Sequence, residues 1–211
     1  MGGVTSIEIH RKVRSSASSL SSNADISLRV PLDTAFLHEH PETKSYLGQI
    51  PSRRGSRPPM ISWILPHRHV AQTAINAQMT TELESHLRSQ GQRNSLLLGP
   101  SIREGNNGLA CYSLRPSSSP AFQHDRLHIH TDNSIHVCLH PKDAALVVDQ
   151  GWGVTFPLAG KPSPSGGLLD FGLVLLYAPR DVDECNMVKQ IMDAGIKYNL
   201  DCISDNAVGY I

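Results

Sequence analysis

The sequence predicts an α+β fold, a single domain in which one mainly antiparallel sheet is packed by about three helices. Helix-like and strand-like segments follow one another without the regular strand–helix–strand alternation that builds a parallel sheet. The 211 residues include 39% hydrophobic side chains, enough for one core without a metal or a disulfide. No apolar run approaches the length that spans a membrane.

Three segments carry the pattern of helices. Apolar residues recur at every fourth position in residues 70–90, on one face of a helix that Gly91 is expected to end. Residues 141–150 begin with proline, whose fixed φ suits a first helical turn. Asp181 and Glu184 form a capping box that starts the third helix. The apolar stripes comprise Ile75, Met79, Leu83 and Leu87 in the first helix and Val182, Cys185, Val188, Met192 and Ile196 in the third.

Short β-prone segments lie between these helices. Leu173–Tyr177 is a continuous apolar run of strand length, which is typical of a central strand buried on both faces. The other predicted strands are Ser95–Leu98, Leu109–Leu114, Arg126–His130, Ile135–His140 and Val154–Pro157.

The two ends of the chain carry weaker patterns than the middle. Residues 1–60 are expected to form an N-terminal arm and an irregular region, in which residues 51–59 are a solvated basic loop. The α+β core is assigned to residues 61–200 and a C-terminal tail to residues 201–211. All candidate functional residues fall in the core segment.

Charge and cysteine content narrow the partners and the compartment. Lys and Arg number 19 and Asp and Glu number 19, so the chain lacks the basic excess of a nucleic-acid binder. No apolar segment follows the basic residues near the N-terminus, so we expect no ordinary secretory signal. The four cysteines show no paired spacing, which indicates a reduced, cytoplasmic protein. A homo-oligomer is compatible with this composition.

Five of the 11 histidines lie between residues 124 and 140. Residues 131–134 have turn composition between two β-prone runs and predict a β-hairpin. An even-numbered loop would send the second strand's histidines to the opposite face. A three-residue loop, with Asn133 in the left-handed conformation that Asn tolerates well, places them all on one face. We favour the three-residue loop, and the shared face then carries His128, His130, His136, Cys138 and His140.

Three interpretations of this face remain open. As general acids and bases, the imidazoles would move protons near neutral pH. As ligands, His128, His130 and His136 would bind one divalent transition metal. As a solvated sheet face, or as histidines hydrogen-bonded to neighbouring loops, they would have no chemical role. H-x-H pairs arise easily in this chain, since His38 and His40 form another.

The motifs around the hairpin resemble the luciferase domain family of small bacterial and fungal proteins. The resemblance covers about residues 70–200. It rests on His128-x-His130, His136, Leu139-x-Pro141, Gly151-Trp152-Gly153, Pro157-Leu158-Ala159-Gly160 and Tyr177-Ala178-Pro179-Arg180. The family usually has Asp-Gly-Ser in the turn, where this chain has Asn133 at the middle position. It also tends to carry an acidic residue and a histidine where this chain has Val154-Thr155-Phe156, so an acid/base role there is lost or replaced.

The matched residues suggest roles beside the histidines. Trp152, Phe156 and Tyr177 would wall an apolar pocket. Arg180 would steady a substrate oxyanion, or would pair with Asp181 or Asp183. Cys138 and His140 would complete the substrate-binding residues, with Cys138 as a small buried side chain rather than a nucleophile.

The leading hypothesis is an enzyme without a cofactor that acts on a hydrophobic small molecule. It would be a cyclase, isomerase or lyase that uses His128, His130, His136 and Arg180 for catalysis. The resemblance implies a place in fungal secondary metabolism. The alternatives are a metalloenzyme of oxygenase or Lewis-acid type that holds one divalent transition metal, and a module that binds a hydrophobic ligand without catalysis. The sequence has no phosphate loop, nucleophile elbow or dinucleotide fingerprint.

Overall fold

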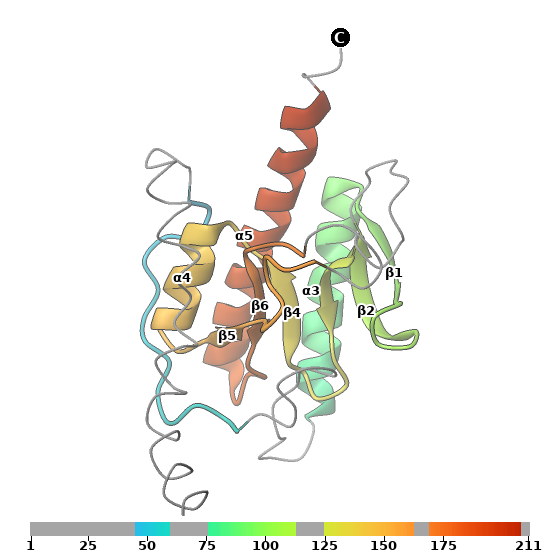
Figure 1. The fold of residues 1–211 in the computed structure, drawn as a ribbon. Coiled ribbons are helices and arrows are strands. Elements are labelled where there is room, and N and C mark those ends of the chain that lie inside the picture. Colours follow the sequence, from blue (N-terminus) through green and yellow to red (C-terminus); the bar gives the residue numbers. More distant parts are fainter. Residues whose placement is uncertain (1–44, 60–75, 113–124, 163–168, 208–211) are drawn as a thin grey trace, which may run out of the picture. The chain divides into compact units, whose positions relative to one another are not determined.

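The computed structural model describes residues 45–59, 76–112, 125–162 and 169–207. These residues form three helices and one six-stranded sheet, and the predicted α+β fold is confirmed (Figure 1). The sheet order is β1-β2-β3-β4-β6-β5, and every neighbouring pair is antiparallel. The elements are α3 (Ala77–Asn94), β1 (Leu97–Ser101), β2 (Asn107–Tyr112), β3 (Asp125–Ile129), β4 (Ile135–Cys138), α4 (Pro141–Asp149), β5 (Gly153–Thr155), β6 (Leu173–Leu176) and α5 (Val182–Ala207). The predicted serine-rich arm and Ile75 lie outside the described residues.

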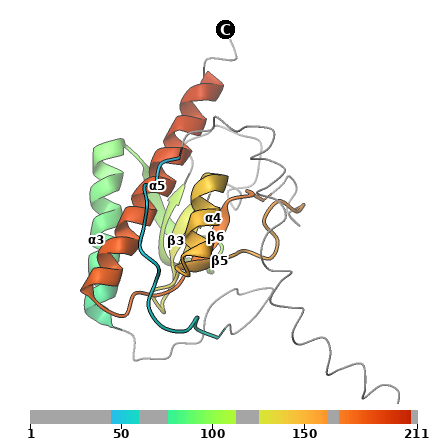
Figure 2. The same ribbon diagram turned by 90° about the vertical axis from the view of Figure 1, so that its left-hand side faces the viewer.

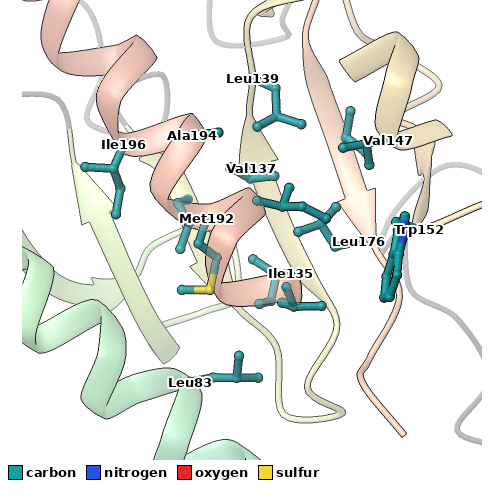
Figure 3. Close-up of a cluster of buried hydrophobic side chains, with 14 of the residues drawn as sticks. Leu83, Ile135, Val137, Leu139, Val147, Trp152, Leu176, Met192, Ala194 and Ile196 are labelled. Carbon is teal, nitrogen blue, oxygen red and sulfur yellow. The ribbon is translucent and has the colours of Figure 1, made fainter. Parts of the chain in front are cut away.

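The described helices pack on one face of the sheet. α5 contacts β3 and β4, α3 contacts β1 and β2, and α4 contacts β5. Figure 2 shows α3 and α5 side by side. Side chains from all three helices and from four strands form one hydrophobic cluster, to which Figure 3 shows Leu83, Val137 and Met192 contributing. Because successive strand residues point to opposite faces, the neighbours of these core residues face away from the helices.

The strand predicted to be central is an interior strand. β6 pairs with β4 on one side and β5 on the other, and all four of its residues are buried. Val174 and Leu176 face the helices, whereas Leu173 belongs to a second, smaller apolar cluster with Cys138 and Phe156. The continuous apolar run therefore reflects burial on both faces, as expected.

α3 differs from its predicted bounds at both ends. Asn76 is its N-cap, and the Asn76 side chain accepts hydrogen bonds from the second and third N–H groups of the helix. Gly91 does not end the helix, which was the prediction. The helix continues to Asn94, and Ser95 takes the left-handed conformation instead. Gly91 has a packing role, because a Cβ there would lie 2.5 Å from the Leu98 side chain.

α5 begins as predicted and runs further. Asp181 Oδ1 accepts a hydrogen bond from the Glu184 N–H at 2.9 Å, as in a capping box. The predicted stripe is buried except for Val182, which is 55% exposed at the first turn. The helix continues to Ala207, through residues that the sequence indicated as a tail. Neither α5 nor another described helix is long and apolar enough to cross a membrane.

Residues 45–59 contain no helix or strand, as expected of an irregular region, but Leu47 and Ile50 anchor the segment to the core. The buried Asp143 carboxylate accepts hydrogen bonds from the backbone N–H groups of Tyr46 and Leu47. Leu47 and Ile50 join the main hydrophobic cluster. The Trp152 indole N–H donates to the Pro51 carbonyl at 2.7 Å. This segment is therefore held by hydrogen bonds to α4 and its flanking loop.

The close approach of α5 to β4 allows this packing to be tested. A Cβ at Gly195 would lie 2.5 Å from Val137 Cγ2 and 3.2 Å from the Cys138 carbonyl oxygen. We expect Gly195→Val to lower the free energy of unfolding by about 1–3 kcal/mol through overpacking. Gly48→Ala, where nothing lies within 4 Å of the added Cβ, is the control. Urea unfolding of both variants checks this, and an unchanged Gly195→Val would contradict the close approach.

Candidate active site

The hairpin between β3 and β4 has the three-residue loop that the sequence favoured. Asn133 has a φ of 67°, in the left-handed region. The His130 N–H donates to the Ser134 carbonyl at 2.8 Å, so these two residues flank the loop. His128 consequently pairs with His136 across the two strands. The predicted register is confirmed, and it depends on a residue that tolerates positive φ.

This register brings three imidazoles together. The ring centroids of His128, His130 and His136 are 4.9, 5.0 and 5.1 Å apart, a nearly equilateral triangle. Their exposed fractions are 2%, 2% and 6%, so the alternative of a solvated sheet face is ruled out. One nitrogen of each ring lies within 4.8 Å of the other two. The strands that carry the rings turn their other face to the helices.

A buried carboxylate fixes the orientation of the first ring. His128 Nδ1 lies 2.9 Å from Asp125 Oδ1, and the Ser101 hydroxyl donates to Asp125 Oδ2 at 2.9 Å. All three residues are buried. A carboxylate accepts and cannot donate, so His128 holds its proton on Nδ1. The remaining nitrogen, Nε2, is then the lone-pair atom of the neutral ring.

The loop fixes the second ring in the same way. His130 Nδ1 lies 2.8 Å from Ser134 Oγ. The Ser134 hydroxyl donates its only proton to Asp132 Oδ1 at 2.6 Å, and the Ser134 N–H donates to the same oxygen. Ser134 Oγ therefore accepts from His130 Nδ1, which leaves the His130 Nε2 atom without a proton in the neutral ring.

The two Nε2 atoms face each other. His128 Nε2 and His130 Nε2 are 3.1 Å apart. Two lone pairs at this distance repel unless a cation lies between them, either a proton that converts one ring to imidazolium or a metal ion bound by both. These three imidazoles could therefore hold a cation. Such a charge can polarise a substrate oxygen or supply a proton.

Glu104 brings a carboxylate to this centre from a different part of the chain. It lies in the turn between β1 and β2, where Gly105 and Asn106 have positive φ and Asn106 N–H donates to the Ser101 carbonyl at 2.8 Å. Glu104 Oε1 is 3.5 Å from His130 Nε2 and 3.8 Å from His128 Nε2. Its negative charge favours a cation among the imidazoles.

Apolar residues adjoin the third ring. Phe156 packs edge-on against His136 with ring centroids 5.2 Å apart. Phe156 and Cys138 belong to the smaller cluster on this face, with Ala159, Leu169 and Leu173. Burial raises the pKa of the Cys138 thiol, which disfavours the nucleophilic thiolate. The structure thus supports the prediction of Cys138 as a buried, unreactive side chain.

The other predicted site residues lie around residues 51–54 instead. Trp152 belongs to the main core cluster, and the Arg53 guanidinium lies over the Tyr177 ring at 5.4 Å from its centroid. Trp152 and Arg180 line a cavity of about 420 Å³ beside this segment. The predicted aromatic wall is corrected accordingly: Phe156 packs against His136, whereas Trp152 and Tyr177 contact Pro51 and Arg53.

Arg180 forms an ion pair with an unexpected partner. Its Nε and backbone N–H each donate to the Glu184 carboxylate at 2.9 Å, and its guanidinium also contacts the Arg54 carbonyl. Arg53 donates to the same carboxylate at 3.0 Å. The predicted partners Asp181 and Asp183 are not used, because Glu184 is one helical turn away and points back. These contacts give Arg180 a structural role.

His140 also has separate neighbours. Its Nδ1 accepts a hydrogen bond from the Lys142 N–H and caps α4. Its ring packs against Tyr198 of α5 and Tyr46, at centroid distances of 5.4 and 6.2 Å. Burial lowers the pKa of this imidazole. β4 ends at Cys138, so the strand alternation that predicted a shared face does not extend to His140.

The fold and the site define an α+β protein with a buried cluster of three histidines. Residues 124–195 match the model of the luciferase domain family, and the predicted resemblance is confirmed over this segment. The relatives found are fungal proteins named luciferase. The chain is 25% identical to the luciferase of Neonothopanus nambi over 173 residues, which cover 75% of this chain and 64% of the relative. It is 26% identical to that of Armillaria gallica over 175 residues, with the same shares. Over a shorter stretch of 72 residues, 36% are identical to the Armillaria mellea protein. The matches thus span less than two thirds of the first two relatives. No solved structure matches.

Sequence reasoning missed the residues that orient the histidines. Asp125 precedes His128 by three positions, and Asp132 lies two positions before Ser134, so both were close enough to suspect. Glu104 lies more than 20 positions upstream in a Gly- and Asn-rich turn. Only the pairing of β1, β2 and β3 brings it to the site.

The loop conformation can be tested with a matched pair. Asn133→Ala and Asn133→Gly both lose the hydrogen bond that Thr80 Oγ1 donates to Asn133 Oδ1, but only alanine is strained at positive φ. We expect Asn133→Gly to be more stable than Asn133→Ala by about 1 kcal/mol, since strain of roughly 1–2 kcal/mol outweighs the added unfolded-state entropy of glycine. Thermal and urea unfolding measure the difference. Equal stabilities would contradict the left-handed turn.

The Arg53–Glu184 pair predicts a pH dependence of stability. Burial by itself raises the pKa of Glu184, but the hydrogen bonds from Arg180 and the charges of Arg53 and Arg180 outweigh it, so the pKa is lowered. A lowered folded-state pKa stabilises the fold above the pKa of unfolded Glu, about 4.3, and this contribution is lost as the pH falls through the folded value.

We therefore expect Glu184→Gln to cost about 3 kcal/mol at neutral pH, because it leaves the Arg53 charge, 6% exposed, without its carboxylate. The difference from wild type should shrink below about pH 4. Glu82→Gln, which removes the more exposed partner of Lys189, is the control and should change stability far less. Urea unfolding across this pH range measures both. A cost that does not depend on pH would contradict the ionised pair.

Proposed function

We propose that this chain is an enzyme that acts on a hydrophobic small molecule at the centre formed by His128, His130 and His136. The observation that carries the proposal is the 3.1 Å contact between two Nε2 atoms whose rings hold their protons on Nδ1. Such a contact favours a cation that lies between the two nitrogens in a buried site. A buried positive charge next to a substrate oxygen is a strong means of stabilising developing negative charge.

The reaction class that fits best is that of a cyclase, isomerase or lyase. These reactions need an oxygen to be polarised and a proton to be moved, and both tasks suit imidazoles around a shared cation. Asp125 and Ser134 act as positioning residues, because they hold His128 and His130 in one tautomer. The apolar side chain of Phe156 beside His136 suits a hydrophobic substrate.

The comparisons support an enzyme but leave the reaction open. The matched relatives are named luciferases, so an enzymatic role for the shared segment is the natural extension to this chain. Their matched part is 64% of their length, so the activity of the whole relative is not transferred. A role in fungal secondary metabolism remains part of this proposal.

The experiment compares small molecules before and after incubation with the purified 211-residue chain. An extract of the source organism is incubated with wild type, with His136→Ala and with the control His86→Ala, whose ring pairs with Asp193. Mass spectrometry should show a compound consumed and an isomer or cleavage products formed. We expect conversion to fall at least about 100-fold in His136→Ala and to persist in His86→Ala.

The outcomes separate the candidate functions. Products that gain oxygen atoms would contradict the isomerase, cyclase or lyase class and favour an oxygenase. A compound retained by the protein but unconverted after prolonged incubation would contradict the enzyme and favour a binding module. Conversion that is equal in wild type and His136→Ala would place the chemistry elsewhere.

A further inference from the structure

We propose that the cation in this centre is a divalent transition metal and that Glu104 is its fourth protein ligand. The proposal rests on the proposed function only for the location of the centre. No Asp or Glu lies at a spacing from the histidines that completes a known metal signature, and Glu104 comes from the turn between β1 and β2. The metal would be bound by three imidazole nitrogens and one carboxylate oxygen.

The distances among the ligand atoms fit a metal. Two imidazole nitrogens bound at about 2.0–2.1 Å to one ion lie roughly 2.9–3.4 Å apart, for angles between octahedral and tetrahedral. His128 Nε2 and His130 Nε2 are 3.1 Å apart. The His136 ring completes a nearly equilateral triangle of ring centroids with them. One of its nitrogens lies within 4.8 Å of the other ligand atoms and would move inward on binding.

The position of Glu104 favours a metal over a shared proton. A carboxylate beside an imidazolium forms a charge-assisted hydrogen bond of about 2.7–2.9 Å. Glu104 Oε1 instead stands 3.5 and 3.8 Å from the two Nε2 atoms. These are separations of atoms that share an ion and do not bond to each other. The carboxylate also neutralises part of the ion's charge in this buried place.

The outer contacts match those of metal-binding histidines. Such residues nearly always donate their second N–H to a carboxylate, a hydroxyl or a carbonyl, which fixes the ring and raises its basicity. Asp125 receives the proton of His128, and Ser134, held by Asp132, receives that of His130. Asp125 is itself fixed by Ser101. This arrangement presents both Nε2 lone pairs to one point.

The donor set limits the identity of the ion. Three imidazoles and one carboxylate suit zinc, iron(II), cobalt(II), nickel(II) or copper(II), whereas calcium and magnesium prefer oxygen ligands. Cys138 packs with Phe156 in the smaller apolar cluster and does not join the three histidines, so no cysteine in the described part of the chain biases the site toward copper(I). A bound ion with an open position would supply Lewis-acid activation of a substrate oxygen.

The test measures metal binding by the full chain without a histidine tag. Elemental mass spectrometry should find about one transition metal ion per chain. After chelation, titration with Co²⁺ should give visible absorption bands of a nitrogen- and oxygen-ligated ion. We expect His136→Ala to weaken Co²⁺ binding at least about 100-fold, and Glu104→Gln and Asp125→Asn to weaken it about 10- to 100-fold. His86→Ala, outside the centre, should bind as wild type does.

The outcomes decide the proposal independently of the enzyme assay. Absence of stoichiometric metal, together with Co²⁺ spectra that are the same in wild type and Glu104→Gln, would overturn it even if the chain converts a substrate. Metal bound equally well by Glu104→Gln would overturn the fourth ligand. If His136→Ala does not fold, a Zn²⁺-dependent rise in melting temperature, present in wild type and reduced in Glu104→Gln, gives the same decision.

Discussion

The left-handed conformation of Asn133 determines how the β3–β4 hairpin is paired, and the chemistry of the site follows from that pairing. A loop of three residues sets His130 opposite Ser134 and His128 opposite His136. A shift of one residue would turn one strand's imidazoles into the helix-facing core and its leucine and isoleucine side chains outward. The burial of Ile129 and Ile135 against the helices therefore stabilises the same register that gathers the histidines. Packing on one face of the sheet and chemistry on the other are set by one turn.

The second constraint is the hydrogen bonding of the rings themselves. Buried imidazoles that were free to rotate would exist in several orientations and tautomers. Here the Asp125 carboxylate and the Ser134 hydroxyl each accept from an Nδ1 atom, and the two Nε2 atoms meet as acceptors. In the proposed metal centre, the bound cation would offset the cost of bringing these lone pairs together, and Glu104 would supply a matching negative charge. The arrangement of the rings is thus linked to the proposed chemistry.

Much of the fold could be predicted because local patterns and tertiary contacts agree. The alternation around the hairpin, the capping box before α5 and the apolar run of β6 each specified their element correctly. Predictions failed where an isolated signal competed with packing: Gly91 lies inside α3 because Leu98 of β1 needs its space. Site residues brought in by strand order, above all Glu104, could not be predicted from spacing. The three residues of the predicted aromatic wall lie in two separate places, because Trp152 and Tyr177 pack near residues 51–54. The composition of that segment indicated a solvated loop and gave no sign of these contacts.

X-ray absorption at the edge of the bound metal tests the central claim most directly, because it counts and identifies the atoms around the ion. We predict a first shell of about four light atoms at roughly 2.0–2.2 Å, with the multiple-scattering pattern of three imidazoles and one carboxylate oxygen. In Glu104→Gln the imidazole pattern should persist while the oxygen distance or number changes. A shell that contains sulfur at about 2.3 Å, a shell without imidazole scattering, or a protein that retains no ion to measure would contradict the account.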